Sequence, residues 1–163
     1  MKLKLDHEPI EIERKFLVAK DGWRNSVIRS TRIRDGLIAL YKERKVRVRI
    51  AGDIATITIK GPRSGITRAE YEYEIPVADA EHMLLTLCHG EILEKQRFFV
   101  EHIGAVWHVD VYGGPLNGIV IAEIELKQEL EPLQLPNWIG KEVTGELSYK
   151  KINMLAQRAG LAC

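Results

Sequence analysis

Glu11, Glu13 and Lys15 alternate with Ile12 and Arg14 near the start of the chain, in the run Glu-Ile-Glu-Arg-Lys. In an extended strand successive side chains point to opposite faces, so the first three residues share one face. Carboxylates spaced in this way can hold a hard divalent cation, and a lysine ammonium can bind phosphate. Alternation is also common in strands with one solvated face, so this segment alone does not separate a site from an ordinary surface.

The same alternation returns in most of the other segments that we expect to be strands. The segment 123–127 nearly repeats the segment 11–15. So many strand faces that mix carboxylates with strong donors indicate a polar interior shared by all the strands. The further charged residues placed on these faces are Arg47, Arg49, Lys60, Arg68, Glu70, Glu72, Glu74, Lys95, Arg97, Asp110, Glu123, Glu125 and Lys127.

The cost of burying charge restricts what this interior can be. Moving one ion into a dry interior costs of order 20 kcal/mol in the idealised limit, and several in practice. A barrel of about eight strands can be filled by side chains or can hold one small ligand. We therefore predict an eight-stranded antiparallel β-barrel around a wet, charged tunnel. The apolar residues predicted to face outward, under helices or loops, are Ile12, Phe16, Val46, Val48, Ile57, Ile59, Ile92, Val106, Val109, Ile121 and Ile124.

The pattern places the strands and the covering helices along the chain as follows. Strands are predicted near residues 9–18, 36–41, 43–51, 53–60, 66–75, 91–101, 105–112 and 119–128. A short helix is predicted from Asp21 to Arg29, and glycine-rich turns at 61–65 and 113–118 are placed at the tunnel mouths. Apolar residues at helical spacing predict two further helices, through Ala80, Met83, Leu84 and Leu87 and through Ile152, Leu155, Ala156 and Ala159.

Composition supports one charged domain and excludes some functions. The 163 residues suit one domain, 1–163, and charged residues make up 29% of them. The net charge of +1 argues against a protein that binds a nucleic-acid duplex. No signal peptide or membrane-spanning apolar stretch stands out, so we expect a cytoplasmic protein without a membrane. Cys88 and Cys163 lack metal-ligand spacing and are expected to be reduced thiols.

The ordered set of charged residues resembles the CYTH superfamily, the triphosphate tunnel metalloenzymes. The segment 11–18 is similar to the ExExK signature of that family, and the later charged residues follow in the family's order, from about residue 8 to residue 160. The segments 142–144 and 149–150 resemble the C-terminal pattern of small bacterial members. The family's fold is an eight-stranded antiparallel barrel that forms a tunnel.

The resemblance implies a role for each matching residue. Glu13, Lys15 and Glu125 are implied as catalytic, and a small-molecule triphosphate is the implied partner. Two Mg²⁺ or Mn²⁺ ions are implied with the substrate, and a homodimer is one possible assembly. The residues implied to bind triphosphate are Lys15, Arg47, Arg49, Lys60, Lys95, Arg97 and Lys150. The implied metal ligands are Glu11, Glu13, Glu72, Asp110, Glu123 and Glu125, with Glu70 as an alternative to Glu72.

Hydrolysis of inorganic tripolyphosphate to pyrophosphate and phosphate is the activity that we prefer. The alternatives are a class IV adenylate cyclase, a thiamine or nucleoside triphosphatase, and a non-catalytic polyphosphate-binding module. No nucleotide-recognition element is visible, and the many carboxylates favour a metal enzyme over a pure anion binder. Since metal must compete with protons for crowded carboxylates, we expect an alkaline activity optimum.

One position departs from the family pattern. Some small bacterial triphosphatases carry a tyrosine shortly after a glycine in the second strand, where this chain has Leu37 after Gly36. Tyr41 could replace it only if the strand were shifted. His108 has the strand parity of Asp110 and so could face the tunnel, although a bystander role is the more common one for such a histidine.

Overall fold

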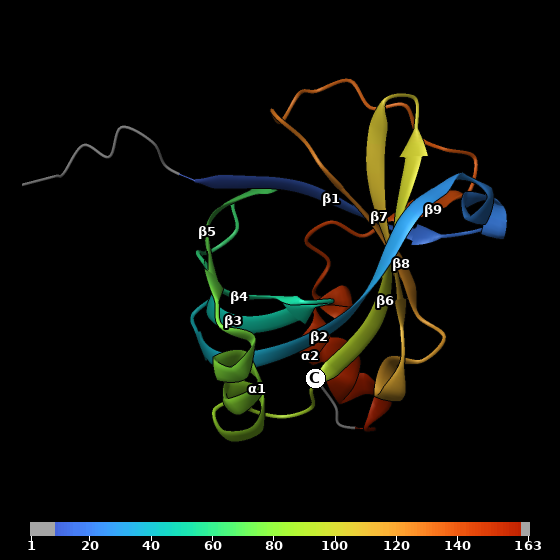
Figure 1. Ribbon diagram of the computed structural model, residues 1–163. Coiled ribbons are helices and arrows are strands. Elements are labelled where there is room, and N and C mark those ends of the chain that lie inside the picture. Colours follow the sequence, from blue (N-terminus) through green and yellow to red (C-terminus); the bar gives the residue numbers. More distant parts are fainter. Residues whose placement is uncertain (1–8, 161–163) are drawn as a thin grey trace, which may run out of the picture.

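A computed structural model describes residues 9–160, in which nine strands form one antiparallel sheet (Figure 1). The strands are β1 (Ile10–Val18), β2 (Val27–Tyr41), β3 (Arg44–Ala51), β4 (Ile54–Lys60), β5 (Thr67–Ile75), β6 (Leu93–His102), β7 (Ala105–Tyr112), β8 (Val120–Glu125) and β9 (Ile139–Glu142). The helices are α1 (Val77–Thr86) and α2 (Lys151–Arg158), with 3-10 turns η1 (Asp21–Ser26), η2 (Gly114–Leu116) and η3 (Leu147–Tyr149).

Strand β1 closes the sheet into a barrel because its two halves pair with different strands. Residues 10–12 pair with β5, and residues 13–17 pair with β8. The strand order is β5-β4-β3-β2-β6-β7-β8-β1, and β9 is an extra strand beside β1. The predicted eight-stranded antiparallel barrel is confirmed.

Three elements differ from the prediction. The helix predicted from Asp21 to Arg29 ends at Ser26, and β2 then runs for 15 residues instead of starting at residue 36. Gly36 interrupts the strand pattern in the sequence, but in the fold it lets α1 approach β2, because a Cβ there would lie 2.6 Å from Leu84 Cδ2. Strand β9 was not predicted, since its four residues have no apolar alternation.

The outer face of the barrel is covered by two apolar clusters, as the prediction requires. Phe16 and Val109 are buried beneath Trp23 and Trp138, which lie on η1 and just before β9. The α1 helix covers β3 and β4 through Ala80 and Leu84, which pack on Val48, Ile50 and Ala55. Coverage is incomplete, because Ile59 remains 44% exposed. The outward prediction was wrong for Val106, which has the strand parity of Asp110 and so lies on the inner face.

A third cluster fills one end of the barrel. Ile121 was predicted to face outward, but it pairs with Asp110, and directly paired residues share a face, so it points inward. It packs there with Leu93, Tyr112, Leu116 and Met154 of α2. This prediction was therefore wrong for Ile121, because the barrel interior changes from polar to apolar toward the end where α2 packs.

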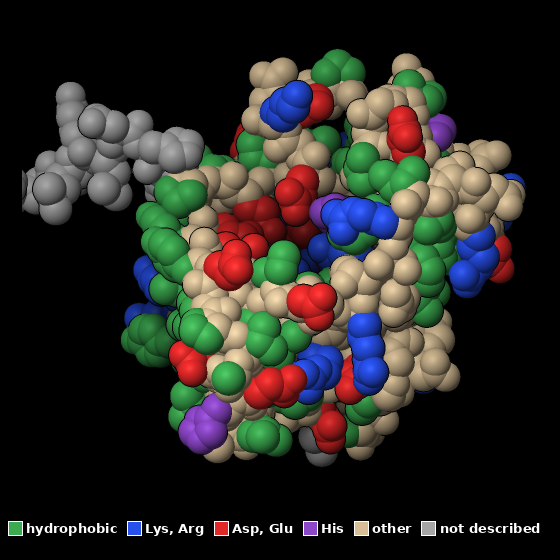
Figure 2. Space-filling model, in the orientation of Figure 1, with side chains coloured by type: hydrophobic (Ala, Val, Ile, Leu, Met, Phe, Trp, Pro, Cys, Tyr) green, Lys and Arg blue, Asp and Glu red, His purple; other side chains and the backbone are tan. Residues whose placement is uncertain are grey.

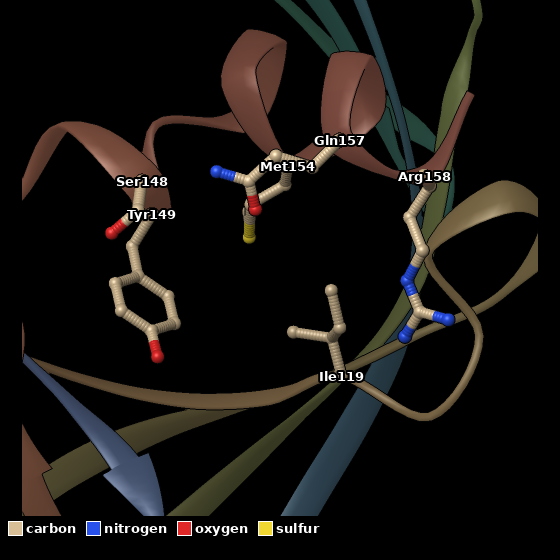
Figure 3. Close-up of a pocket in the computed structure, with 6 residues that line it drawn as sticks. All are labelled: Ile119, Ser148, Tyr149, Met154, Gln157 and Arg158. Carbon is tan, nitrogen blue, oxygen red and sulfur yellow. The ribbon is translucent and has the colours of Figure 1, made fainter. Parts of the chain in front are cut away.

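The α2 helix was predicted, but its main contact is Met154, which the predicted apolar face omitted. The side chain of Ile152 lies outside the described residues. A hollow of about 200 Å³ lies under α2 and contains no carboxylate, and Arg158 at its edge donates to the carbonyl of Asn117 at 3.4 Å (Figure 3). The charged residues of the sequence pattern therefore lie elsewhere.

Two further features of the structure concern membrane-spanning helices and the cysteines. No helix within residues 9–160 has the length and apolar character needed to cross a bilayer. Cys88 is a free thiol beside α1, and burial raises its pKa, whereas Cys163 lies outside the described residues.

The β6–β7 hairpin turn provides a stability test. Ile103 and Gly104 form its two-residue loop, with φ values of 48° and 72°. Such loops favour Asn-Gly, because a β-branched residue is strained at positive φ. Ile103 is 67% exposed and loses little packing when replaced. We expect Ile103→Asn to raise the free energy of unfolding by about 1 kcal/mol.

Thermal unfolding measures this effect, as a rise in Tm of about 2–4 °C for each kcal/mol in a domain of this size. Ile103→Val is the control, since it keeps the branched side chain and should leave Tm unchanged. A Tm for the Asn variant at or below that of the parent protein would show that the turn stores no strain.

Candidate active site

The strand register brings most of the predicted site residues onto the inner face of the barrel. Glu13 pairs with Glu125, and Lys15 with Glu123, across β1 and β8. Arg97 pairs with Asp110 across β6 and β7. The inner face continues on β3, β4 and β5, where Arg47, Thr58 and Glu72, and Lys45, Lys60 and Glu70, stand side by side. Figure 2 shows the molecule hollowed here, with acidic side chains gathered in its depth and basic side chains beside them.

A buried ion network joins β6, β7 and β8. Asp110 is fully buried and accepts from Arg97 Nε and Nη2, each at 2.7 Å, and from Lys95 Nζ. Arg97 Nη2 also donates to Glu123 at 2.7 Å, and Glu123 accepts from Lys15 Nζ at 2.5 Å. Burial alone would raise the pKa of Asp110, but Lys95 and Arg97 lower it. The cations that were predicted to bind phosphate therefore form ion pairs here with the carboxylates that were predicted to bind metal.

A second network joins β1, β4 and β5. Lys60 Nζ donates to Glu11 at 2.8 Å and to Glu70 at 2.6 Å, and Arg68 Nε donates to Glu11 at 2.5 Å. Burial and the neighbouring Glu11 carboxylate raise the pKa of Glu70 to about 7, while the pKa of Glu11 is lowered. Glu70 is therefore the carboxyl group of this pair that takes up a proton as the pH falls through about 7.

Glu125, unlike Glu11, Glu13, Asp110 and Glu123, has no ion pair within residues 9–160. Burial of its carboxyl group, followed by the nearby Glu13 and Glu11 carboxylates, raises its pKa. Oxygen ligands with uncompensated negative charge are what a hard divalent cation requires. In the described part of the chain no three acidic, His or Cys side chains converge into a preformed metal cluster. The residues therefore fit a divalent cation by ligand type, and its arrival would relieve their repulsion.

Asp35 and Lys151 belong to the interior but were not predicted. Asp35 is buried and accepts from Arg49 Nε at 2.6 Å, from Arg49 Nη2 at 3.1 Å and from Lys151 Nζ at 2.8 Å. Lys151 and Arg49 lower its pKa well below the ordinary value, although burial alone would raise it. Because Lys151 is the first residue of α2, this contact ties the helix to the barrel. The alternation that could have revealed Asp35 was missed because the predicted strand began one residue later.

Lys150 is not brought to this cluster. Its side chain is exposed, and Nζ lies 3.4 Å from Glu43 in the β2–β3 turn. Lys150 precedes the first helical residue in an extended conformation, so the helix directs Lys151 inward in its place. Arg63 and Arg68 were not assigned to the site either, although Arg63 lies 3.4 Å from Glu13 and Arg68 contacts Glu11.

The structure shows which residues occupy and flank the position where some family members carry a tyrosine. Leu37 pairs with inward-facing Arg47, whereas Tyr41 pairs with Arg44 on the outer face and is 67% exposed. Tyr41 therefore does not replace the tyrosine. His108 faces inward, with Nδ1 at 3.3 Å from Arg97 Nη1, and burial followed by the Arg97 charge lowers its pKa to about 4. The imidazole is neutral at pH 7.

The inner-face pattern of paired carboxylates and cations matches a known family. The CYTH domain profile matches residues 9–157. This chain belongs to the CYTH family. Its resemblance to triphosphate tunnel enzymes, first seen in the ExExK run, is confirmed.

Individual CYTH proteins extend this comparison. The chain is 43% identical over 145 residues to an inorganic triphosphatase of Acetivibrio thermocellus, covering 89% of this chain and 92% of the relative. The crystal structure of the inorganic triphosphatase NE1496 matches with a TM-score of 0.62 and 30% identity, over 89% of this chain and 97% of that one. HpAC1 of Hippeastrum, a proposed adenylyl cyclase with a dominant triphosphatase activity, shares the fold, with a TM-score of 0.54 at 12% identity, over 72% and 80%.

Asp110 provides a stability test of the buried CYTH network. Replacing it by Asn leaves Lys95 and Arg97 with one charged partner fewer in a buried setting. Breaking such a pair typically costs about 3–5 kcal/mol, and we expect a loss in this range for Asp110→Asn. Glu72→Gln is the control, because the Glu72 side chain is 44% exposed. In urea unfolding, Glu72→Gln should lower the free energy of unfolding by no more than about 1 kcal/mol. An equal decrease for both variants would show that the buried network contributes no special stability.

Proposed function

We propose that this CYTH protein is a divalent-metal-dependent inorganic triphosphatase, which hydrolyses tripolyphosphate to pyrophosphate and phosphate. The observation that carries the proposal is a barrel interior in which cations from several strands surround a group of carboxylates, one of them, Glu125, uncompensated. Support also comes from the two similar proteins that carry this name, at 43% and 30% identity.

The roles of the inner residues follow from their chemistry. Lys15, Arg47, Arg49, Lys60, Lys95 and Arg97 would orient the triphosphate and spread its charge, since phosphoryl transfer depends mainly on positioning and charge neutralisation. Arginine suits this task because its planar fork can bind two oxygens. Lys150 is left out of this group, because its side chain lies outside the barrel interior.

Glu11, Glu13 and Glu125 are the residues proposed to hold Mg²⁺ or Mn²⁺, with Glu72, Asp110 and Glu123 as further candidate ligands. A bound divalent cation would supply charge neutralisation and activation of water. Asp110 and Glu123 have a second task in the free protein, because they hold Lys15, Lys95 and Arg97 in place. Triphosphatases of this family are generally metal-dependent. We propose Mg²⁺ or Mn²⁺ as the metal.

Product formation tests the proposal directly. The protein is supplied with Mg²⁺ or Mn²⁺ at about pH 8, where carboxylates are free for metal, and separately with tripolyphosphate, ATP and thiamine triphosphate. We expect phosphate release chiefly from tripolyphosphate. Cyclic AMP and pyrophosphate from ATP would replace the proposal with a cyclase, and binding without turnover would replace it with a polyphosphate-binding module.

The Glu125 carboxylate is expected to be needed for turnover but not for binding of tripolyphosphate. Glu125→Gln should lower kcat by at least about 100-fold, because an amide is a poorer metal ligand, while thermal stabilisation by tripolyphosphate persists. Glu94→Gln on β6 is the control, since Glu94 lies on the outer face, next to inward-facing Lys95, and its side chain is 46% exposed. Unchanged turnover in Glu125→Gln would contradict the metal assignment.

Activity should rise with pH across the neutral range. Glu70 has a pKa of about 7, so below neutral pH it holds a proton that competes with metal, and the raised pKa of Glu125 acts in the same direction. We expect kcat/KM at limiting metal to increase from pH 5 to 8, and Glu70→Gln to move this rise to lower pH. A maximum near pH 5 would refute the role of these carboxylates.

A further inference from the structure

Lys45 is an inward-facing cation that the sequence pattern did not single out. It lies on β3 and pairs with Lys60 on β4 and Leu40 on β2, so its side chain is on the inner face of the barrel. Each inward-facing cation that was predicted has a carboxylate within 4.0 Å. Within residues 9–160, Lys45 has neither an ion pair nor a side-chain hydrogen bond.

The surroundings of Lys45 carry positive charge. Burial, followed by Arg68 of β5, Lys151 of α2, Lys60 of β4 and Lys15 of β1, lowers the pKa of Lys45 to about 6. An ammonium in this position therefore weakens the folded state when the barrel holds no anion. If the Lys45 side chain served only to pack against its neighbours, a methionine could replace it without loss of stability.

The neighbouring inward residue on β3, Arg47, has one donor atom without an acceptor. Arg47 donates to Thr58 Oγ1 at 3.1 Å and lies 3.5 Å from Glu72, but its Nε is buried and has no hydrogen-bond partner in the described structure. Buried donors without acceptors are rare and costly in native proteins. Lys45 and Arg47, two residues apart on the inner face of β3, thus each carry a donor without an acceptor, and an anion bound beside them could accept from both.

We propose that Lys45 is a substrate-binding residue, whose ammonium donates to a phosphate oxygen of the triphosphate next to Arg47. This inference rests on the proposed function and extends it to a residue outside the ExExK pattern. The substrate supplies the negative charge that Lys45 lacks in the free protein. Lys45 thus lowers the stability of the empty barrel and strengthens binding of the polyanion.

The test compares three variants of the full chain. Lys45→Met removes the charge and keeps an unbranched side chain, and Lys45→Arg keeps the charge. Arg44→Met is the matched control, since Arg44 is the preceding residue, is exposed and pairs with Tyr41 on the outer face. Melting temperatures are measured in EDTA with and without tripolyphosphate, and kcat and KM are measured with Mg²⁺.

We expect empty Lys45→Met to melt above the parent protein, yet to be stabilised less by tripolyphosphate. Loss of one hydrogen bond between charged groups should raise KM by roughly 10- to 100-fold, with kcat changed by only a few-fold. Lys45→Arg should retain most of the binding, and Arg44→Met should match the parent protein in both assays.

The results separate this inference from the proposed function. If the parent protein hydrolyses and binds tripolyphosphate, and Lys45→Met does so with the same KM and the same thermal shift, the role of Lys45 is refuted alone. If empty Lys45→Met melts lower and its KM is unchanged, Lys45 is structural and the inference is also refuted. If the parent protein neither binds nor hydrolyses tripolyphosphate, both proposals fail.

Discussion

Charge compensation inside the barrel is the constraint on which the rest of the structure depends. An ion in a buried setting needs partners, because the loss of hydration costs several kcal/mol for each ion. The inner strand faces meet this need by alternating acids and bases across neighbouring strands, as Asp110 does with Lys95 and Arg97. The barrel can therefore hold many charged groups before any ligand is bound.

This compensation also prepares the interior for a ligand of mixed charge. A metal–triphosphate complex brings negative oxygens for the bases and positive charge for the acids. Ion pairs such as Lys15 with Glu123 could then exchange partners without leaving either group buried and alone. Glu125 and Lys45 stand out because neither has an ion-pair partner in the described structure, and one is an acid and the other a base.

Strand alternation in the sequence was enough to predict the barrel and the inner face of most strands. It was enough because the side-chain period of two is local, so Glu13 and Lys15 share a face whatever the remainder of the chain does. The choice of ion-pair partner is not local. It depends on register between distant strands, and the contact of Lys151 with Asp35 joins residues 116 positions apart.

The errors in the sequence interpretation have the same origin. Ile121 looked like an outer apolar residue because the pattern cannot show where along its axis a barrel changes from polar to apolar. Lys45 was passed over because a lone lysine beside a hairpin turn resembles an ordinary surface residue. Only the closed barrel shows that it is surrounded by other cations.

The position of α2 at one end of the barrel has a consequence for how substrate enters and products leave. Met154 and Lys151 fix the helix across one end, where Leu93, Tyr112 and Ile121 fill the remaining space. With α2 across this end, reactant and products would use the opposite opening. The fragment bound deeper would then leave after the outer one, so the position of α2 would set the order in which the two products depart.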